Sequence, residues 1–105
     1  METLTKESLY KAITKCQETN NYRVLIVTKF LASQNIIQQE WLRPTGIMFN
    51  ETKNGINVRF DNGSIIRGIS LSNNCRGYKA NLVLCEDWML EDDDINNRLR
   101  YFEIL

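Results

Sequence analysis

The chain has 105 residues with 13 basic and 13 acidic side chains, and its zero net charge weakens a nucleic-acid-binding role without excluding a local basic patch. It contains no histidine and only three cysteines, which excludes histidine-based nucleophilic catalysis and makes a four-ligand zinc site very unfavourable. Because the sequence has neither an apolar run of membrane-spanning length nor a signal-peptide pattern, we expect one cytoplasmic domain over residues 1–105, with no membrane contact.

The first elements are a helix followed by a buried strand. Residues 4–19 carry apolar side chains at helical spacing, and Thr5 or Thr3 is suited to cap the start of this helix. The segment Arg23–Val27 is continuously apolar after its first residue, which is typical of a strand covered on both faces. The sequence thus predicts a strand inside a parallel sheet.

A second helix is expected over residues 30–42. Its helical spacing places three large apolar side chains on one side, namely Phe30, Ile37 and Trp41. Pro44 disfavours the helical conformation of Arg43, so we expect the helix to end there. Trp41 is predicted to belong to the core.

The middle of the chain has the character of antiparallel strands. Turn sequences occur at Asn54-Gly55 and Asn62-Gly63, between short runs of β-forming residues. The expected strands are Ile47–Phe49, Ile56–Phe60 and Ser64–Ser70. We predict that they form a small antiparallel meander.

The last third begins with a polar link, residues 72–79, and continues into a second buried strand, Leu82–Cys85. Either Asp87 or Asp92–Asp94 is suited to begin a short helix, because carboxylates stabilise its positive end. Tyr101–Leu105 is expected to be a final strand. The predicted fold is a layered α/β domain with a mixed sheet, two buried parallel strands near each other, flanking helices and the meander.

Two segments carry a family resemblance. Asn62-Gly63-Ser64, then Arg76-Gly77, then an apolar strand ending in Glu86-Asp87 resemble the middle of the viral terminase large-subunit ATPase. The segment Arg23–Trp41 is similar to the strand and helix that follow the nucleotide loop in the same proteins. The resemblance covers roughly residues 8–90. It implies a viral or phage origin and a P-loop NTPase-like fold.

The phosphate-binding loop of that superfamily is missing from the sequence. Catalysis there requires the pattern G-x-x-x-x-G-K-[ST], and none of the five glycines of this chain is followed by lysine. The chain begins where the helix after that loop would run, so we expect no residues for the loop or for the strand before it. The sequence predicts a non-catalytic protein-binding or regulatory module without a cofactor. The alternative is part of a DNA-packaging ATPase, in which a partner chain or an upstream segment supplies the loop for ATP and Mg²⁺.

Glu86 and Asp87 are the candidate catalytic or metal-binding residues. The resemblance implies an aspartate followed by a glutamate, one for Mg²⁺ and one for the attacking water, whereas this chain has the reverse order. An exchange of side-chain length would misplace each oxygen by about 1.5 Å. Relics or helix caps are therefore the alternative interpretation. Together with residues 91–94 they make six carboxylates, which are either a solvated helix start or a divalent-metal site.

Four further residues are candidates for contacts. Arg76 and Lys79 are suited to bind a phosphate or a neighbouring subunit, unless they merely belong to a turn held by Gly77. Trp88 and Tyr78 are candidate anchors for a protein partner, because large aromatic side chains dominate binding hot spots.

Overall fold

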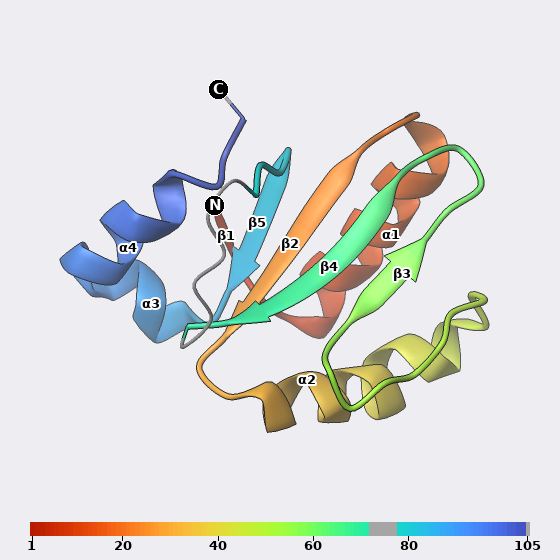
Figure 1. Cartoon of the computed structure of the whole chain (residues 1–105), viewed down its shortest axis with the longest axis horizontal. Helices are drawn as coiled ribbons and strands as arrows, with labels where there is room; N and C mark the ends of the chain where they lie inside the picture. The colour runs from red at the N-terminus through yellow and green to blue at the C-terminus, as the bar shows by residue number, and fades with distance from the viewer. Residues whose placement is uncertain (72–77, 105) are drawn as a thin grey trace.

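The structure is a computed structural model that describes residues 1–71 and 78–104. In these ranges a five-stranded sheet crosses the molecule, with helices packed on it (Figure 1). The strands are β1 (Glu2–Thr3), β2 (Arg23–Thr28), β3 (Asn57–Arg59), β4 (Ile65–Ser70) and β5 (Leu82–Cys85). The helices are α1 (Lys6–Glu18), α2 (Leu31–Ile37), the π-helical turn η1 (Gln38–Leu42), the 3₁₀ turn η2 (Arg43–Thr45), α3 (Asp87–Glu91) and α4 (Asp93–Arg100).

The strand order is β1-β5-β2-β4-β3. β2 pairs in parallel with both β5 and β4, β1 pairs in parallel with β5, and β3 alone is antiparallel, to β4. The predicted α/β class with a mixed sheet is therefore confirmed. The prediction that the two apolar strands, β2 and β5, are parallel and near each other is confirmed as well, and the two strands are direct neighbours.

Helices on both faces of the sheet explain why β2 is continuously apolar from Val24 to Val27. Val24 and Ile26 belong to the core under α1 and α2, whereas Leu25 and Val27 belong to a second core under α3 and α4. Successive side chains of a strand point to opposite faces, so a central strand covered twice needs apolar residues at every position. The same holds for β5, where Leu84 and Val83 divide between the two cores.

Helix α1 begins with a side-chain cap. Thr5 Oγ1 accepts from the Ser8 backbone N–H at 2.9 Å, and Ser8 Oγ accepts from the Thr5 N–H at 2.8 Å, which completes a capping box. Thr5 is thus confirmed as the cap. The two-residue strand β1, which the sequence did not indicate, precedes this cap, so the expectation of no preceding strand was wrong.

The second helix differs from its prediction at both ends. Arg43 stays in the helical region with φ −55° and ψ −45°, so the expected stop before Pro44 was wrong. Pro44 instead lies in the first turn of η2, where the missing N–H costs no hydrogen bond. The helical path ends at Gly46, whose φ is +75°. Phe30, expected on the apolar side with Ile37, is 62% exposed.

The predicted meander is also only partly present. Ile47–Phe49 forms no strand: Ile47 and Phe49 pack against the first core, while the backbone of the segment stays unpaired with β3. The antiparallel unit is therefore the single hairpin of β3 and β4. The longer strand, β4, joins the parallel sheet along β2, from Ile65 opposite Arg23 to Ser70 opposite Thr28.

The carboxyl-terminal part consists of two short helices. Asp87 begins α3, and Asp92 caps α4 by accepting from the Ile95 N–H at 3.1 Å, so both predicted helix starts are used. The described residues of the expected strand Tyr101–Leu105 form turns instead. Their only pairing is a bridge between Glu103 and Ala80. Within the described ranges, none of the helices has the length and apolar character that crossing a bilayer requires.

Candidate functional site at the carboxyl edge of the sheet

The parallel strands β2, β4 and β5 all end at one edge of the sheet, between the beginnings of α2 and α3 (Figure 1). In open α/β sheets, the crevice outside the carboxyl ends of the strands is the usual place for ligands. At this edge Lys29 and Phe30 follow β2, and Glu86, Asp87 and Trp88 follow β5. Two of the three candidate residues after β5, Glu86 and Trp88, contact Lys29.

Glu86 ties these two segments together. One carboxylate oxygen, Oε2, accepts from the Lys29 backbone N–H at 3.1 Å and from the Trp88 indole Nε1–H at 3.0 Å. The side chain is half-buried, and both donors are far from each other in the sequence. Glu86 thus fixes the path of the chain after β2 and the orientation of the Trp88 ring.

Lys29 lies between two exposed aromatic rings. Its Nζ is 5.4 Å from the centroid of the Phe30 ring and 5.6 Å from that of the Trp88 ring. Phe30 is 62% exposed and Trp88 is 37% exposed. A cation between two ring faces is attracted by both, so the three side chains form one platform. We call Lys29, Phe30 and Trp88 the aromatic edge.

Asp87 has a local structural role. Its Oδ1 accepts from the Trp88 backbone N–H at 2.8 Å in the first turn of α3. The carboxylate pair that was the candidate for catalysis and metal binding is therefore directed at protein donors. Among the residues that the structure describes, no group of three or more Cys, Asp or Glu side chains is arranged to hold a metal ion.

The connection between β1 and α1 is short. It consists of Leu4 and Thr5 only, and the Leu4 N–H donates to the Cys85 carbonyl at 2.6 Å. The helix begins directly with the Thr5–Ser8 capping box, whose hydroxyl already binds the Ser8 N–H. This two-residue connection is much shorter than the G-x-x-x-x-G-K-[ST] loop that surrounds a triphosphate.

Asn62-Gly63-Ser64, the motif on which the resemblance rests most, holds the end of α1. Asn62 Nδ2 donates to the Cys16 carbonyl at 2.7 Å, and Ser64 Oγ donates to the Thr19 carbonyl at 2.6 Å. The Tyr22 N–H donates to Ser64 Oγ at 3.0 Å and so links the motif to the approach of β2. Gly63 has φ +86° and lies against Asn21, where a side chain would overlap. The motif is explained by packing within this fold.

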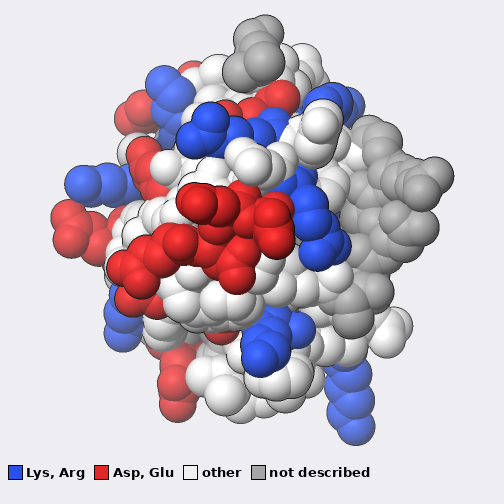
Figure 2. Space-filling model, turned by 90° about the vertical axis from the view of Figure 1, so that its left-hand side faces the viewer, with Lys and Arg blue, Asp and Glu red and all other residues white. Residues whose placement is uncertain are grey.

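The acidic segment lies on α3 and α4. Figure 2 shows a cluster of carboxylates on this side of the molecule, among other acidic residues, and residues 91–94 are all exposed. Asp92 caps α4, while Asp93 and Asp94 occupy its first turn, where negative charge is stabilising. The solvated helix start thus accounts for the cluster.

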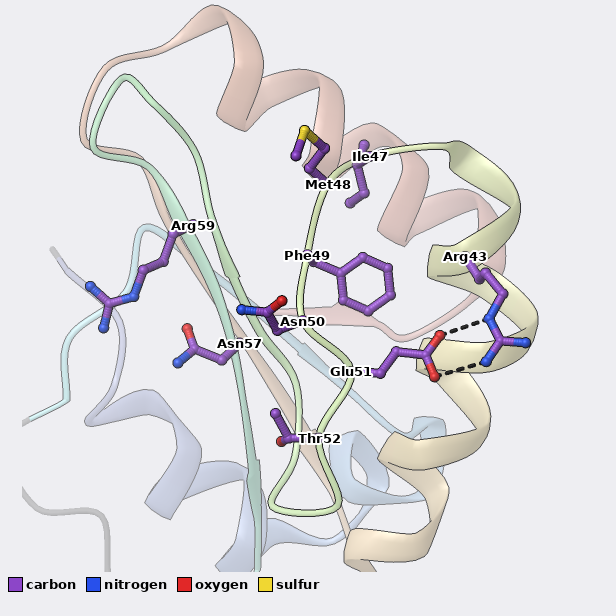
Figure 3. A pocket seen from close by; sticks show the side chains of 9 residues that line it. All are labelled: Arg43, Ile47, Met48, Phe49, Asn50, Glu51, Thr52, Asn57 and Arg59. Carbon is purple, nitrogen blue, oxygen red and sulfur yellow. Dashed lines mark hydrogen bonds and ion pairs between the residues drawn. The ribbon is translucent and has the colours of Figure 1, made fainter.

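A surface groove of about 660 Å³ lies between residues 47–52 and β3 (Figure 3). Arg43 on one side makes a two-pronged ion pair with Glu51, at 2.7 and 2.8 Å. On the other side Asn57 and Arg59 project from β3, away from this pair. Because Arg43 is already neutralised and Met48 is 92% exposed, the groove has few converging groups to bind a ligand.

Two of the remaining candidates, Tyr78 and Lys79, lie at the end of the sheet where β2 begins. Tyr78 stacks with Arg67, whose Cζ is 4.4 Å from the ring centroid, and Lys79 Nζ donates to the Tyr101 carbonyl. Arg76 and Gly77 lie outside the described residues. The sequence analysis missed Lys29 and Phe30 at the aromatic edge. Phe30 was instead expected on the apolar side of the second helix, whereas α2 begins one residue later, at Leu31.

Comparisons with protein-family models, with curated proteins and with solved structures gave no match to this chain.

Proposed function

We propose that this chain is a non-catalytic protein-binding module that docks on a partner protein through the aromatic edge. The observation that carries the proposal is the pair of exposed rings, Phe30 and Trp88, on either side of Lys29. Large aromatic side chains are over-represented in the energetic centres of protein interfaces. Their place at the carboxyl edge of a parallel sheet adds to this support.

The edge is preorganised, which favours affinity. Glu86 holds the Trp88 indole by a hydrogen bond of 3.0 Å and holds the backbone at Lys29 by another of 3.1 Å. A ring that is already fixed loses little conformational entropy when a partner covers it. The cost of binding is therefore lower than for mobile aromatic side chains.

The chemistry of the edge defines the partner. Two rings require an apolar segment of the partner, and the exposed ammonium of Lys29 favours a carboxylate next to that segment. The acidic residues 91–94 on the adjoining helices favour basic side chains at the rim. We therefore expect a protein partner with an apolar centre and charges of both signs around it.

The proposal includes a terminase-like, viral or phage ancestry in which nucleotide hydrolysis has been lost. The two-residue connection between β1 and α1, and the use of Glu86 for protein hydrogen bonds, support the loss. Since the alternative requires a loop from another chain, it predicts hydrolysis of Mg²⁺-ATP only in a mixed complex. Phosphate release by the purified chain that disappears in Glu86→Gln would contradict the non-catalytic part of the proposal.

The docking part is tested by affinity capture with matched variants. Immobilised wild type, Phe30→Ala, Trp88→Ala and Tyr101→Ala are exposed to an extract of the producing cell, and each retained protein is quantified. Tyr101 is the control, because its ring is 76% exposed but lies outside the aromatic edge. A specific partner is retained by wild type and Tyr101→Ala and reduced at least about tenfold by the other two variants.

The partner is then purified and its affinity measured by calorimetry. We expect Lys29→Gln to weaken binding less than Trp88→Ala, because a rim charge contributes less than a buried anchor. Equal affinity of wild type, Phe30→Ala and Trp88→Ala for that partner would show that docking occurs elsewhere. Circular dichroism of each variant verifies that it is folded.

A further inference from the structure

A second pocket, of about 330 Å³, lies on the face of the sheet that carries α3 and α4, at the end where β2 begins. Its floor contains the apolar side chains of Leu25 and Ile65. Residues 78–80 pass over this floor before β5 and form its wall. The pocket is at the opposite end of β2 from the aromatic edge, and its volume is within the range of small-molecule sites.

Three cationic side chains from three segments line this pocket. Arg23 begins β2, Arg67 lies in the middle of β4, and Lys79 belongs to the wall. The parallel register places Arg23 opposite Ile65 and Arg67 opposite Leu25, so all four share one face of the sheet. All three cations are exposed, and no aspartate or glutamate is among the described residues that line the pocket.

The charge of the pocket contrasts with that of the whole chain. The net charge is zero, and Figure 2 shows one cluster of carboxylates on the side of the molecule where α3 and α4 lie, with other carboxylates elsewhere on the surface. A neutral chain can therefore keep a concentrated positive charge around one small concave site. Three cations with no carboxylate among the described lining residues attract an anion, and arginine guanidinium groups match the geometry of phosphate.

An aromatic group adds a second requirement. Tyr78 is half-buried in the wall, and the Arg67 guanidinium is stacked on its ring at 4.4 Å. Arginine planes and tyrosine rings are the side-chain surfaces on which nucleic-acid bases stack. Inorganic phosphate would bind the cations but would make no contact with the apolar floor or with the Tyr78 ring. A ligand with a flat ring and a phosphate uses both.

We propose that the pocket between Arg23, Arg67, Tyr78 and Lys79 is a binding site for a nucleoside monophosphate group. The base stacks on Tyr78 and Arg67 above the floor of Leu25 and Ile65, and the cations hold the phosphate. The group belongs either to a free nucleotide or to a single-stranded nucleic acid. The site binds without hydrolysis and is independent of the aromatic edge.

The test is a titration of the isotope-labelled protein, followed by the amide NMR signals, at about 50 mM salt. The probes are dTMP, thymidine, inorganic phosphate and a short oligothymidylate. We expect dTMP to shift the signals of β2, β4 and residues 78–80. Arg67→Gln and Lys79→Gln should each weaken dTMP binding about tenfold, the loss expected for one charge-assisted hydrogen bond.

Tyr78→Leu separates the stacking role from the charge. It should weaken dTMP binding but leave the affinity for inorganic phosphate unchanged, so the preference for the nucleotide over phosphate disappears. The control is Arg98→Gln, which removes an exposed cation of α4 outside the pocket and should change nothing. If Arg67→Gln does not fold, Arg23→Gln and Lys79→Gln carry the same test.

The probes also distinguish the two sources of the group. A free-nucleotide site binds dTMP at least as tightly as oligothymidylate, whereas a single-strand site binds the oligomer more tightly and with a steeper salt dependence. Absence of shifts with both dTMP and oligothymidylate at about 1 mM overturns the proposal. Equal weakening by Arg98→Gln, or displacement of dTMP by an equimolar triglutamate peptide, overturns it as well.

Discussion

The side-chain amide of Gln34 occupies the space that Gly68 leaves open beside β4. Gln34 is fully buried, and its Oε1 accepts from the Ile56 N–H at 3.0 Å while its Nε2 donates to Thr28 Oγ1 at 3.2 Å. A Cβ at position 68 would overlap Oε1. One polar side chain of α2 thus fastens the end of β2 to the segment before β3, and a glycine makes this possible.

We predict that Gly68→Ala lowers the free energy of unfolding by about 2 kcal/mol, because the methyl group displaces Gln34 from its buried hydrogen bonds. Urea unfolding measures the change. Gly46→Ala is the matched control, since its surroundings are open and only the strain at φ +75° remains, about 1 kcal/mol. If the overlap is the cause, adding Gln34→Ala to Gly68→Ala costs less than the sum of the two single changes.

A second prediction concerns the motif that holds the end of α1. Asn62→Ala and Ser64→Ala should each lower the free energy of unfolding by about 1 to 2 kcal/mol, because Cys16 and Thr19 lose the donors to their carbonyls. Asp61→Ala, at the exposed neighbouring position, should stay within about 0.5 kcal/mol of wild type. Unchanged stability of both cap variants would mean that the motif is kept for a contact outside this chain.

The third prediction concerns the rigidity of Trp88. Glu86→Ala removes the acceptor of the indole N–H, so the Trp88 indole signal should shift and its hydrogen exchange should accelerate. The chain has one other tryptophan, Trp41, whose indole signal serves as an internal control. The stability should fall by only about 1 kcal/mol. Slow exchange at Trp88 after the substitution would show that other contacts fix the ring.

The fourth prediction is a dependence of stability on alkaline pH. Burial raises the pKa of the Cys16 thiol from its ordinary value of 9.0 to about 11. Below pH 9 the thiol is protonated in the folded and the unfolded chain, so its contribution to stability is fully present. Between pH 9 and about 11 only the unfolded chain loses the proton, and the free energy of unfolding should fall as the pH rises.

Cys16→Ala should be less stable at pH 7, because the methyl group fills less of the site, but its stability should fall less between pH 9 and 11. Some dependence remains, since burial also raises the pKa of Tyr22 and of Cys85. Urea unfolding at a series of pH values gives both quantities. A fall of the same steepness in wild type and Cys16→Ala would assign the effect to other groups.

Local patterns predicted the parts of the fold that depend on local chemistry. The helical spacing of α1, its Thr5 cap and the double-sided burial of β2 and β5 all follow from residues close in sequence. The failure at Ile47–Phe49 has a different origin. A strand needs a paired neighbour, and whether this segment lies beside β3 or folds onto the core depends on packing that a local pattern does not contain.

The two candidate sites were also predicted only in part, because they combine residues that are far apart in the sequence. Trp88, Tyr78 and Lys79 were recognisable as unusual residues, and each lies at one of the two sites. Their partners were not recognisable, because Lys29 meets Glu86 across 57 positions and Arg67 meets Tyr78 only once β4 has paired with β2. Contacts of this kind can be predicted only when the pairing of the strands is known.

The two outermost strands of the sheet are its shortest. β1 has two residues and β3 has three, and each carries an exposed charge, Glu2 and Arg59 respectively. Short, charged edge strands are poor templates for pairing with a strand of another molecule. They therefore disfavour the fibrillar aggregation that a long, exposed edge strand promotes. In concentrated solution, a neutral, β-branched substitution at Arg59 should therefore increase aggregation far more than the loss of a surface charge on the helices.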